Sequence, residues 1–124
     1  MGSRRSSVTW TEPAWVRVCP AHDLMPGVGA SALARGKRVA IFRLDDGSVY
    51  AVSNRDPFSG TPSISRGLVG MRASGPVVAA PRGRQVFDLA TGRCADDPGV
   101  QLQTYPVRIT DGYVEVRVLV RGAA

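Results

Sequence analysis

The stretch Arg38–Ser53, RVAIFRLDDGSVYAVS, decides the fold class of this chain. Two runs rich in β-branched and aromatic residues, Arg38–Leu44 and Ser48–Ser53, flank the dipeptide Asp46-Gly47. An Asp-Gly pair between two such runs is the strongest short-range signal for a β-hairpin, because glycine tolerates the positive φ that a tight turn requires. We therefore predict that the two runs pair antiparallel.

Short apolar runs separated by turn residues continue on both sides of this hairpin. They predict further strands from Trp15 with Val16 and Val18 on one face, and at Gly29–Leu33, Pro76–Ala80, Gln85–Leu89, Val107–Ile109 and Tyr113–Val120. Asp111-Gly112 indicates a second hairpin, between the last two runs. No stretch keeps a helical period over three turns. The sequence predicts an all-β fold of roughly eight short strands, arranged as a small antiparallel sandwich or barrel.

The remaining segments define the domain limits. Residues 1–13 are polar and rich in Ser and Arg, which predicts a flexible N-terminal arm. Residues 14–120 form the predicted β domain, and residues 121–124 a short C-terminal tail. Residues 54–75 hold four glycines and two prolines with little periodicity, and an irregular segment of that length inside a domain is usually functional.

Length and composition restrict the class of protein. The chain has 124 residues, enough for one domain, and 44% hydrophobic with 21% charged residues is typical of a globular core. No apolar run approaches the ~18 residues that cross a bilayer, and the first residues lack the apolar region of a secretory signal. We expect a cytoplasmic protein with no membrane partner.

The net charge of +6 raises the question of a nucleic-acid partner. Fifteen of the sixteen basic residues are arginine, and they form scattered pairs and triplets rather than one long run. This distribution does not favour nucleic acid, although a basic OB-like nucleic-acid-binding domain remains an alternative.

The supply of metal ligands is very small. Cys19, Cys94 and His22 are the only cysteines and the only histidine. They cannot complete a four-ligand zinc site or a cluster that needs two histidines. The spacing Cys19-Pro-Ala-His22 imitates a ligand pair, but we expect Cys19 to be a half-buried strand residue and His22 a turn residue. A disulfide between the two cysteines is not expected in a reducing compartment.

The order of the motifs resembles a Rieske-type domain. In that family two loops carry the iron ligands, the second just before a strand that is similar to Phe87–Gly92, FDLATG. Counting back from Phe87 places the second ligand pair at Ala80 and Gly83, and the first pair falls on Asp56 and Phe58. None of these four residues is a cysteine or a histidine, so the resemblance implies a domain without the [2Fe-2S] ligands.

A Rieske-like domain with replaced ligands is similar to the small subunits of assimilatory NAD(P)H-dependent nitrite reductases. The resemblance extends from about Trp15 to Val118 and rests on four motifs: Asn54–Ser59, Ser65–Gly70, Pro76–Ala79 and Tyr105–Arg108. It implies a non-catalytic subunit with no cofactor of its own. Its partner would be a large subunit that carries FAD, a [4Fe-4S] cluster and sirohaem and reduces nitrite to ammonium. An electron-transfer Rieske-like ferredoxin is the other alternative.

Structural roles follow for the residues at the replaced ligand positions. We expect the Asp56 carboxylate to accept bonds from nearby backbone amides, and the Phe58 ring to fill the volume that a cluster would occupy. Phe42, Tyr50, Phe87 and Tyr105 are predicted core residues. Arg66, Arg82 and Arg84 are candidates for a partner interface, since the two ligand loops of a Rieske domain converge at one tip.

Overall fold

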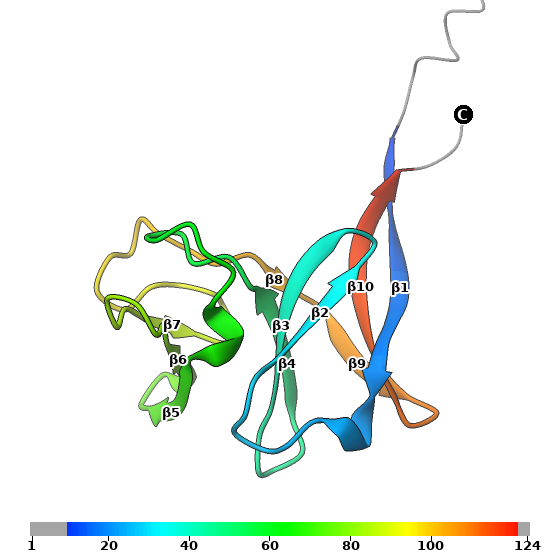
Figure 1. Cartoon of the computed structure of the whole chain (residues 1–124), viewed down its shortest axis with the longest axis horizontal. Helices are drawn as coiled ribbons and strands as arrows, with labels where there is room; N and C mark the ends of the chain where they lie inside the picture. Colours follow the sequence, from blue (N-terminus) through cyan, green and yellow to red (C-terminus); the bar gives the residue numbers. More distant parts are fainter. Residues whose placement is uncertain (1–9, 122–124) are drawn as a thin grey trace, which may run out of the picture.

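The computed structural model describes residues 10–121, and within them it is built almost entirely of antiparallel strands (Figure 1). The strands are β1 (Thr11–Pro20), β2 (Ala30–Ala34), β3 (Lys37–Arg43), β4 (Val49–Ser53), β5 (Leu68–Arg72), β6 (Gly75–Ala79), β7 (Val86–Asp88), β8 (Thr104–Tyr105), β9 (Val107–Thr110) and β10 (Tyr113–Arg121). Two 3-10 turns, η2 (Ala21–Asp23) and η3 (Ile64–Arg66), interrupt them. The all-β prediction is confirmed. Between residues 10 and 121 the structure has no helix long and apolar enough to span a membrane.

The strands form three sheets, with the orders β1-β10-β9, β2-β3-β4-β8 and β5-β6-β7. Figure 1 shows β1 and β10 on one side of the β3–β4 hairpin, and the small β5-β6-β7 sheet on the other. The central hairpin therefore separates two cores.

Alternate side chains of β3 enter these two different cores. Val39 and Ile41 pack in one core with Val116 of β10, whereas Ala40 and Phe42 pack in the other, which includes residues of β6 and β7. Successive residues of a strand point to opposite faces, so a strand covered on both faces needs an unbroken apolar run. This double burial explains why β3 reads as a continuous apolar segment.

The predicted hairpin is confirmed. Arg43 pairs with Val49, and the Leu44 N–H donates to the Ser48 carbonyl at 2.9 Å. Gly47 has a φ of +88°, and the Asp46 carboxylate accepts the Ser48 N–H at 2.9 Å. The second hairpin is confirmed as well, since β9 and β10 pair across Asp111-Gly112. Of the predicted core aromatics, three are buried and Tyr50 is half-buried.

The structure differs from the sequence predictions at the chain ends. β1 begins at Thr11, within the predicted arm, because Thr11 pairs with Arg121 across the β1–β10 ladder. β10 likewise includes Arg121, the first residue of the predicted tail. The rest of the predicted arm and tail, residues 1–9 and 122–124, lies outside the described residues.

Two strands were not predicted. β5 lies inside the segment predicted to be irregular, and its Leu68 and Met71 side chains are 78% and 71% exposed. An edge strand that leaves its large apolar residues in solvent lacks the alternation by which strands are recognised. β8 has only two residues and pairs with β4 through Ala51 and Tyr105, which is too short to give a pattern.

Candidate functional site

Asp56 organises the first of the two loops that correspond to the ligand loops. It is fully buried, and its Oδ1 accepts the N–H groups of Phe58 at 2.9 Å and Ser59 at 3.4 Å. Its backbone closes the same loop, because its carbonyl accepts the Gly60 N–H and its N–H donates to the Thr61 carbonyl. The Asp56 carboxylate therefore accepts the bonds from nearby backbone amides that the sequence predicts.

Asn54 joins this loop to η3, a role that was not predicted. Its Oδ1 accepts the Ser65 N–H at 2.7 Å, and its Nδ2 donates to the Pro62 carbonyl at 3.3 Å. The side chain is buried, so these two bonds satisfy groups that would otherwise be costly to remove from water. Asn54 is the first residue of the Asn54–Ser59 motif, two positions before Asp56. A short amide side chain at that position was the sequence feature that could have indicated this role.

Phe58 lies at the surface, beside β7. Its side chain remains 43% exposed, and its ring centroid lies 6.2 Å from that of Phe87. The Phe58 N–H donates to the buried Asp56 carboxylate, which ties the backbone at this position into the loop. The ring bridges the first loop to β7 at the surface.

The second loop connects β6 to β7 as a tight turn. Ala80 is buried, and its N–H donates to the Gln85 carbonyl at 2.8 Å. Gly83 and Arg84 both adopt positive φ values, +69° and +61°. This conformation places Arg82 and Arg84 in solvent at the tip of the turn.

The structure joins the first loop to β7 but separates the candidate arginines. Phe58 of the first loop lies beside Phe87 of β7, the strand that follows the second loop. Arg82 and Arg84 lie on the second loop, whereas Arg66 ends η3 on a different element. All three side chains are exposed, and within residues 10–121 none of them forms an ion pair.

The four ligand positions do not fit a [2Fe-2S] cluster, which needs thiolate or imidazole ligands. Asp56, Phe58, Ala80 and Gly83 supply one carboxylate, which is already bonded to backbone amides. Over the part of the chain that the structure describes, no group of three or more His, Cys, Asp or Glu side chains could hold a metal ion.

The two cysteines and the histidine lie on other elements than the two loops. Cys19 is a half-buried residue of β1, and burial raises the pKa of its thiol. His22 is an exposed residue of η2, beside the Asp23 carboxylate. Cys94 is buried against Phe87 in the second core, and neither thiol forms a disulfide.

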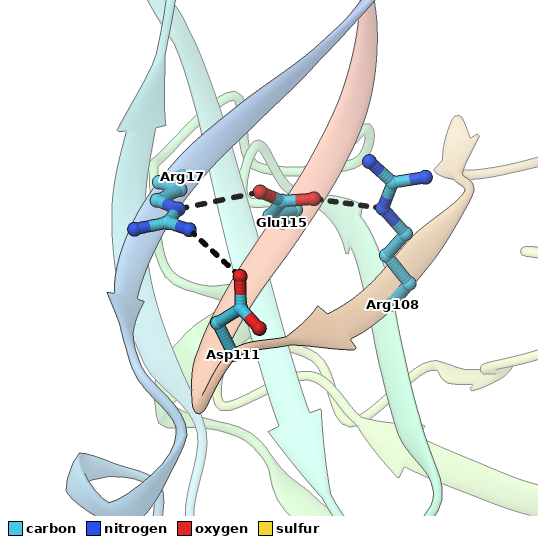
Figure 2. Close-up of polar contacts among 4 residues, drawn as sticks. All are labelled: Arg17, Arg108, Asp111 and Glu115. Carbon is cyan, nitrogen blue, oxygen red and sulfur yellow. Dashed lines mark hydrogen bonds and ion pairs between the residues drawn. The ribbon is translucent and has the colours of Figure 1, made fainter.

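A charged cluster on the outer face of the β1-β10-β9 sheet was not predicted (Figure 2). The Glu115 carboxylate accepts Arg108 Nε at 2.7 Å and Arg17 Nε at 3.4 Å, and Arg17 also lies 3.7 Å from Asp111. The bond from Arg108, with that from Arg17, lowers the pKa of Glu115 below its ordinary value despite partial burial. Arg108 also lies over the Trp15 ring at 4.0 Å. This cluster joins three strands of one sheet and is structural.

The three-sheet architecture, with the first loop beside β7 and the second loop leading into β7, defines the class of protein as a Rieske-like domain whose ligand positions are replaced. The family model of the Rieske-like [2Fe-2S] domain matches residues 14–117, so the chain belongs to that family.

Comparison with individual proteins narrows the class. The nitrite reductase (NADH) small subunit of Salmonella typhimurium is 38% identical over 104 residues, which cover 83% of this chain and 96% of that protein. A crystal structure of a protein assigned as an NADH-dependent nitrite reductase small subunit from Mycobacterium tuberculosis is 44% identical. It superposes with a TM-score of 0.84 over 88% of this chain and 98% of that chain. Within the Rieske-like domains, this chain belongs to the nitrite reductase small subunits.

A related segment also occurs inside a much longer protein. The nitrite reductase NAD(P)H large subunit of Klebsiella oxytoca is 31% identical over 102 residues, which cover 82% of this chain and only 11% of that protein. The fold of this chain is thus also found joined covalently to a large subunit.

Proposed function

We propose that this chain is the non-catalytic small subunit of a cytoplasmic nitrite reductase, and that it assembles with a large subunit that performs the chemistry. In this proposal the large subunit carries FAD, a [4Fe-4S] cluster and sirohaem. It takes electrons from NADH or NADPH and reduces nitrite to ammonium. The small subunit carries no cofactor and contributes a binding surface and stability.

The observation that carries the proposal is the segment within the Klebsiella large subunit. Two units that are fused in one protein and separate in another are expected to work together, because fusion fixes their proximity and raises their effective concentration. The replaced ligand positions support the non-catalytic role, since a chain without thiolate or imidazole at these positions has no means of holding the family's electron carrier there.

We propose further that the second-loop tip contacts the large subunit. Arg82 and Arg84 present two exposed guanidinium groups with no intramolecular partner in the described part of the chain. A guanidinium group can hold a carboxylate with two parallel bonds, which suits an ion pair across an interface. Arg66 is a third candidate, on the neighbouring η3.

Neither alternative has a specific observation in its favour. An electron-transfer ferredoxin needs cluster ligands at positions that hold Asp56, Phe58, Ala80 and Gly83. An OB-like nucleic-acid binder needs aromatic rings stacked on one sheet face. The exposed aromatic side chains of the described residues, Trp10, Phe58 and Tyr113, lie on separate elements.

Co-expression of the untagged chain with the large subunit tests the proposal. We expect the two chains to elute together and NADH- or NADPH-dependent nitrite reduction to require the large subunit. The isolated small subunit is expected to reduce no nitrite with reduced viologen as the electron donor. Turnover by the isolated chain, or a failure of the two chains to associate, would contradict the proposal.

A further inference from the structure

Three hollows lie side by side near the end of the β2-β3-β4-β8 sheet where β3 begins. The first, of about 300 Å³, is lined by Lys37, Arg38, Arg55 and Tyr105 among others. The second, also about 300 Å³, shares Lys37 and Tyr105 with the first and adds Arg117 of β10. The third, of about 350 Å³, shares Arg38 with the first. Because each hollow shares lining residues with its neighbour, the three are adjacent, and together we call them the basic groove.

The charge of the basic groove is entirely of one sign. Lys37, Arg38, Arg55 and Arg117 line it, and none of the ten acidic residues of the sequence does. The ion pairs found among residues 10–121 involve other cations, so these four have no carboxylate partner there. The Arg117 guanidinium also lies 5.9 Å from the centre of the Trp15 ring.

Such an arrangement favours an anionic occupant. Cations in a concave surface with low-dielectric walls reinforce one another's potential, and they repel one another until an anion offsets them. Ser53 and Tyr105 add hydroxyl groups to the lining, and a hydroxyl can donate a hydrogen bond to a carboxylate. The groove thus offers charge and directional donors together.

The shape and position of the groove favour a chain segment over a single small ion. The three adjacent hollows extend from β2 across the start of β3 to β10, which is an elongated path. The first hollow is also lined by Gly60 and Pro62 of the first ligand-type loop. The groove is therefore continuous with one of the two loops that form the tip.

We propose that an extended, carboxylate-rich segment of the large subunit lies in the basic groove, with its Asp or Glu side chains paired to Lys37, Arg38 and Arg55. This inference rests on the proposed function and names the chemistry of the partner at a surface separate from Arg82 and Arg84. The groove determines which residues of the segment face its cations, and the contact at Arg82 and Arg84 adds to the binding of the large subunit.

The amino-acid composition of the chain allows a direct test. Lys37 is the only lysine in the sequence, so it carries the only side-chain primary amine. A carbodiimide joins an amine to a carboxylate as an amide with no spacer, and it does so only where the two groups touch. Treatment of the co-purified complex, followed by protease digestion and mass spectrometry, should identify an amide between Lys37 and an Asp or Glu of the large subunit. The Lys37→Arg variant keeps the charge, so it should bind within about twofold of wild type and lose this cross-link.

Charge reversal supplies the second measurement. Lys37→Glu with Arg38→Glu should weaken binding to the large subunit at least tenfold at low salt, because attraction is replaced by repulsion. Arg72→Glu with Arg93→Glu is the matched control, since both residues are exposed, lie outside the groove and give the same change in net charge. The control should change binding by less than threefold.

The outcomes separate the two proposals. If wild type forms no complex, the proposed function fails and the groove inference fails with it. If wild type binds, the inference is overturned by the absence of a Lys37 cross-link, by equal weakening in both double variants, or by an unaffected groove variant. In each of those cases the subunit role of the chain stands.

Discussion

Replacing Asp56 with alanine removes the group that holds the first loop closed. The Phe58 N–H bond at 2.9 Å is short and has a carboxylate acceptor, and a hydrogen bond to a charged group contributes about 1.5–3 kcal/mol. The Ser59 bond at 3.4 Å is at the limit of useful geometry and adds little. An opposite contribution comes from the buried Asp56 Oδ2, which has no hydrogen-bond partner in the described structure. Removing this atom relieves the free-energy cost of burying an unsatisfied polar group. We expect Asp56→Ala to lower the free energy of unfolding by about 1–3 kcal/mol.

Urea unfolding of wild type and variant, followed by tryptophan fluorescence and far-UV circular dichroism, measures this difference. A loss of 2 kcal/mol corresponds to a decrease in Tm on the order of 5–10 °C for a domain of this size. Asp56→Asn keeps an acceptor oxygen but not the charge, so its loss should be about half as large.

Asp46→Ala is the matched control for burial. Asp46 also accepts the N–H of the residue two positions later at 2.9 Å, but its turn is exposed. Water can replace its bonds, so the loss should be clearly smaller than for Asp56→Ala. A loss below about 0.5 kcal/mol for Asp56→Ala, or equal losses at the two positions, would refute the reasoning that burial makes this carboxylate important.

Three further predictions concern the cofactor, the tip and the pH dependence. Iron and acid-labile sulfide analysis of the purified chain should find neither, even after anaerobic reconstitution, and a stoichiometric cluster would contradict the role proposed here. Arg82→Glu with Arg84→Glu should weaken binding to the large subunit in calorimetric titration, with little change in the Tm of the isolated chain; no weakening beyond that of Arg72→Glu with Arg93→Glu would place the interface elsewhere. Glu115 has a folded-state pKa below 4.5, so its contribution to stability is present above pH 4.5 and is lost as the pH falls through the folded pKa. Urea unfolding should therefore show a stability advantage of wild type over Glu115→Gln at pH 7 that shrinks by pH 3, and a constant difference would be the contrary result.

The features that the sequence predicted correctly are those that local chemistry determines. The Asp46-Gly47 turn and the strand at Arg38–Leu44 lie within one short stretch, and turn residues and strand-forming residues act over that range. Asp56 was also predictable, because a carboxylate before a tight loop finds amide donors two and three residues later.

The features that were missed depend on residues far apart in the chain. Arg17 and Glu115 are separated by 98 positions, and only the β1–β10 pairing brings them together. The contact of the Phe58 ring with Phe87 of β7 likewise depends on the fold and not on neighbours in the sequence. β5 pairs with β6 although its large apolar residues face solvent, so its existence is decided by backbone hydrogen bonds rather than by burial of its own side chains.

The replaced ligands change how the two loops are held. In a cluster-bearing Rieske domain the metal ligands come from both loops and cross-link them through iron. In this chain each loop closes on itself, the first through Asp56 and Asn54 and the second through the bond between Ala80 and Gln85. Closing short loops separately costs less chain entropy than holding two loops together through one long closure, so the fold can lose the cluster without losing the loops. What remains is a pair of loops without thiolate or imidazole at the ligand positions, next to a groove whose cations form no ion pair among the described residues, and such a surface is suited to binding another subunit.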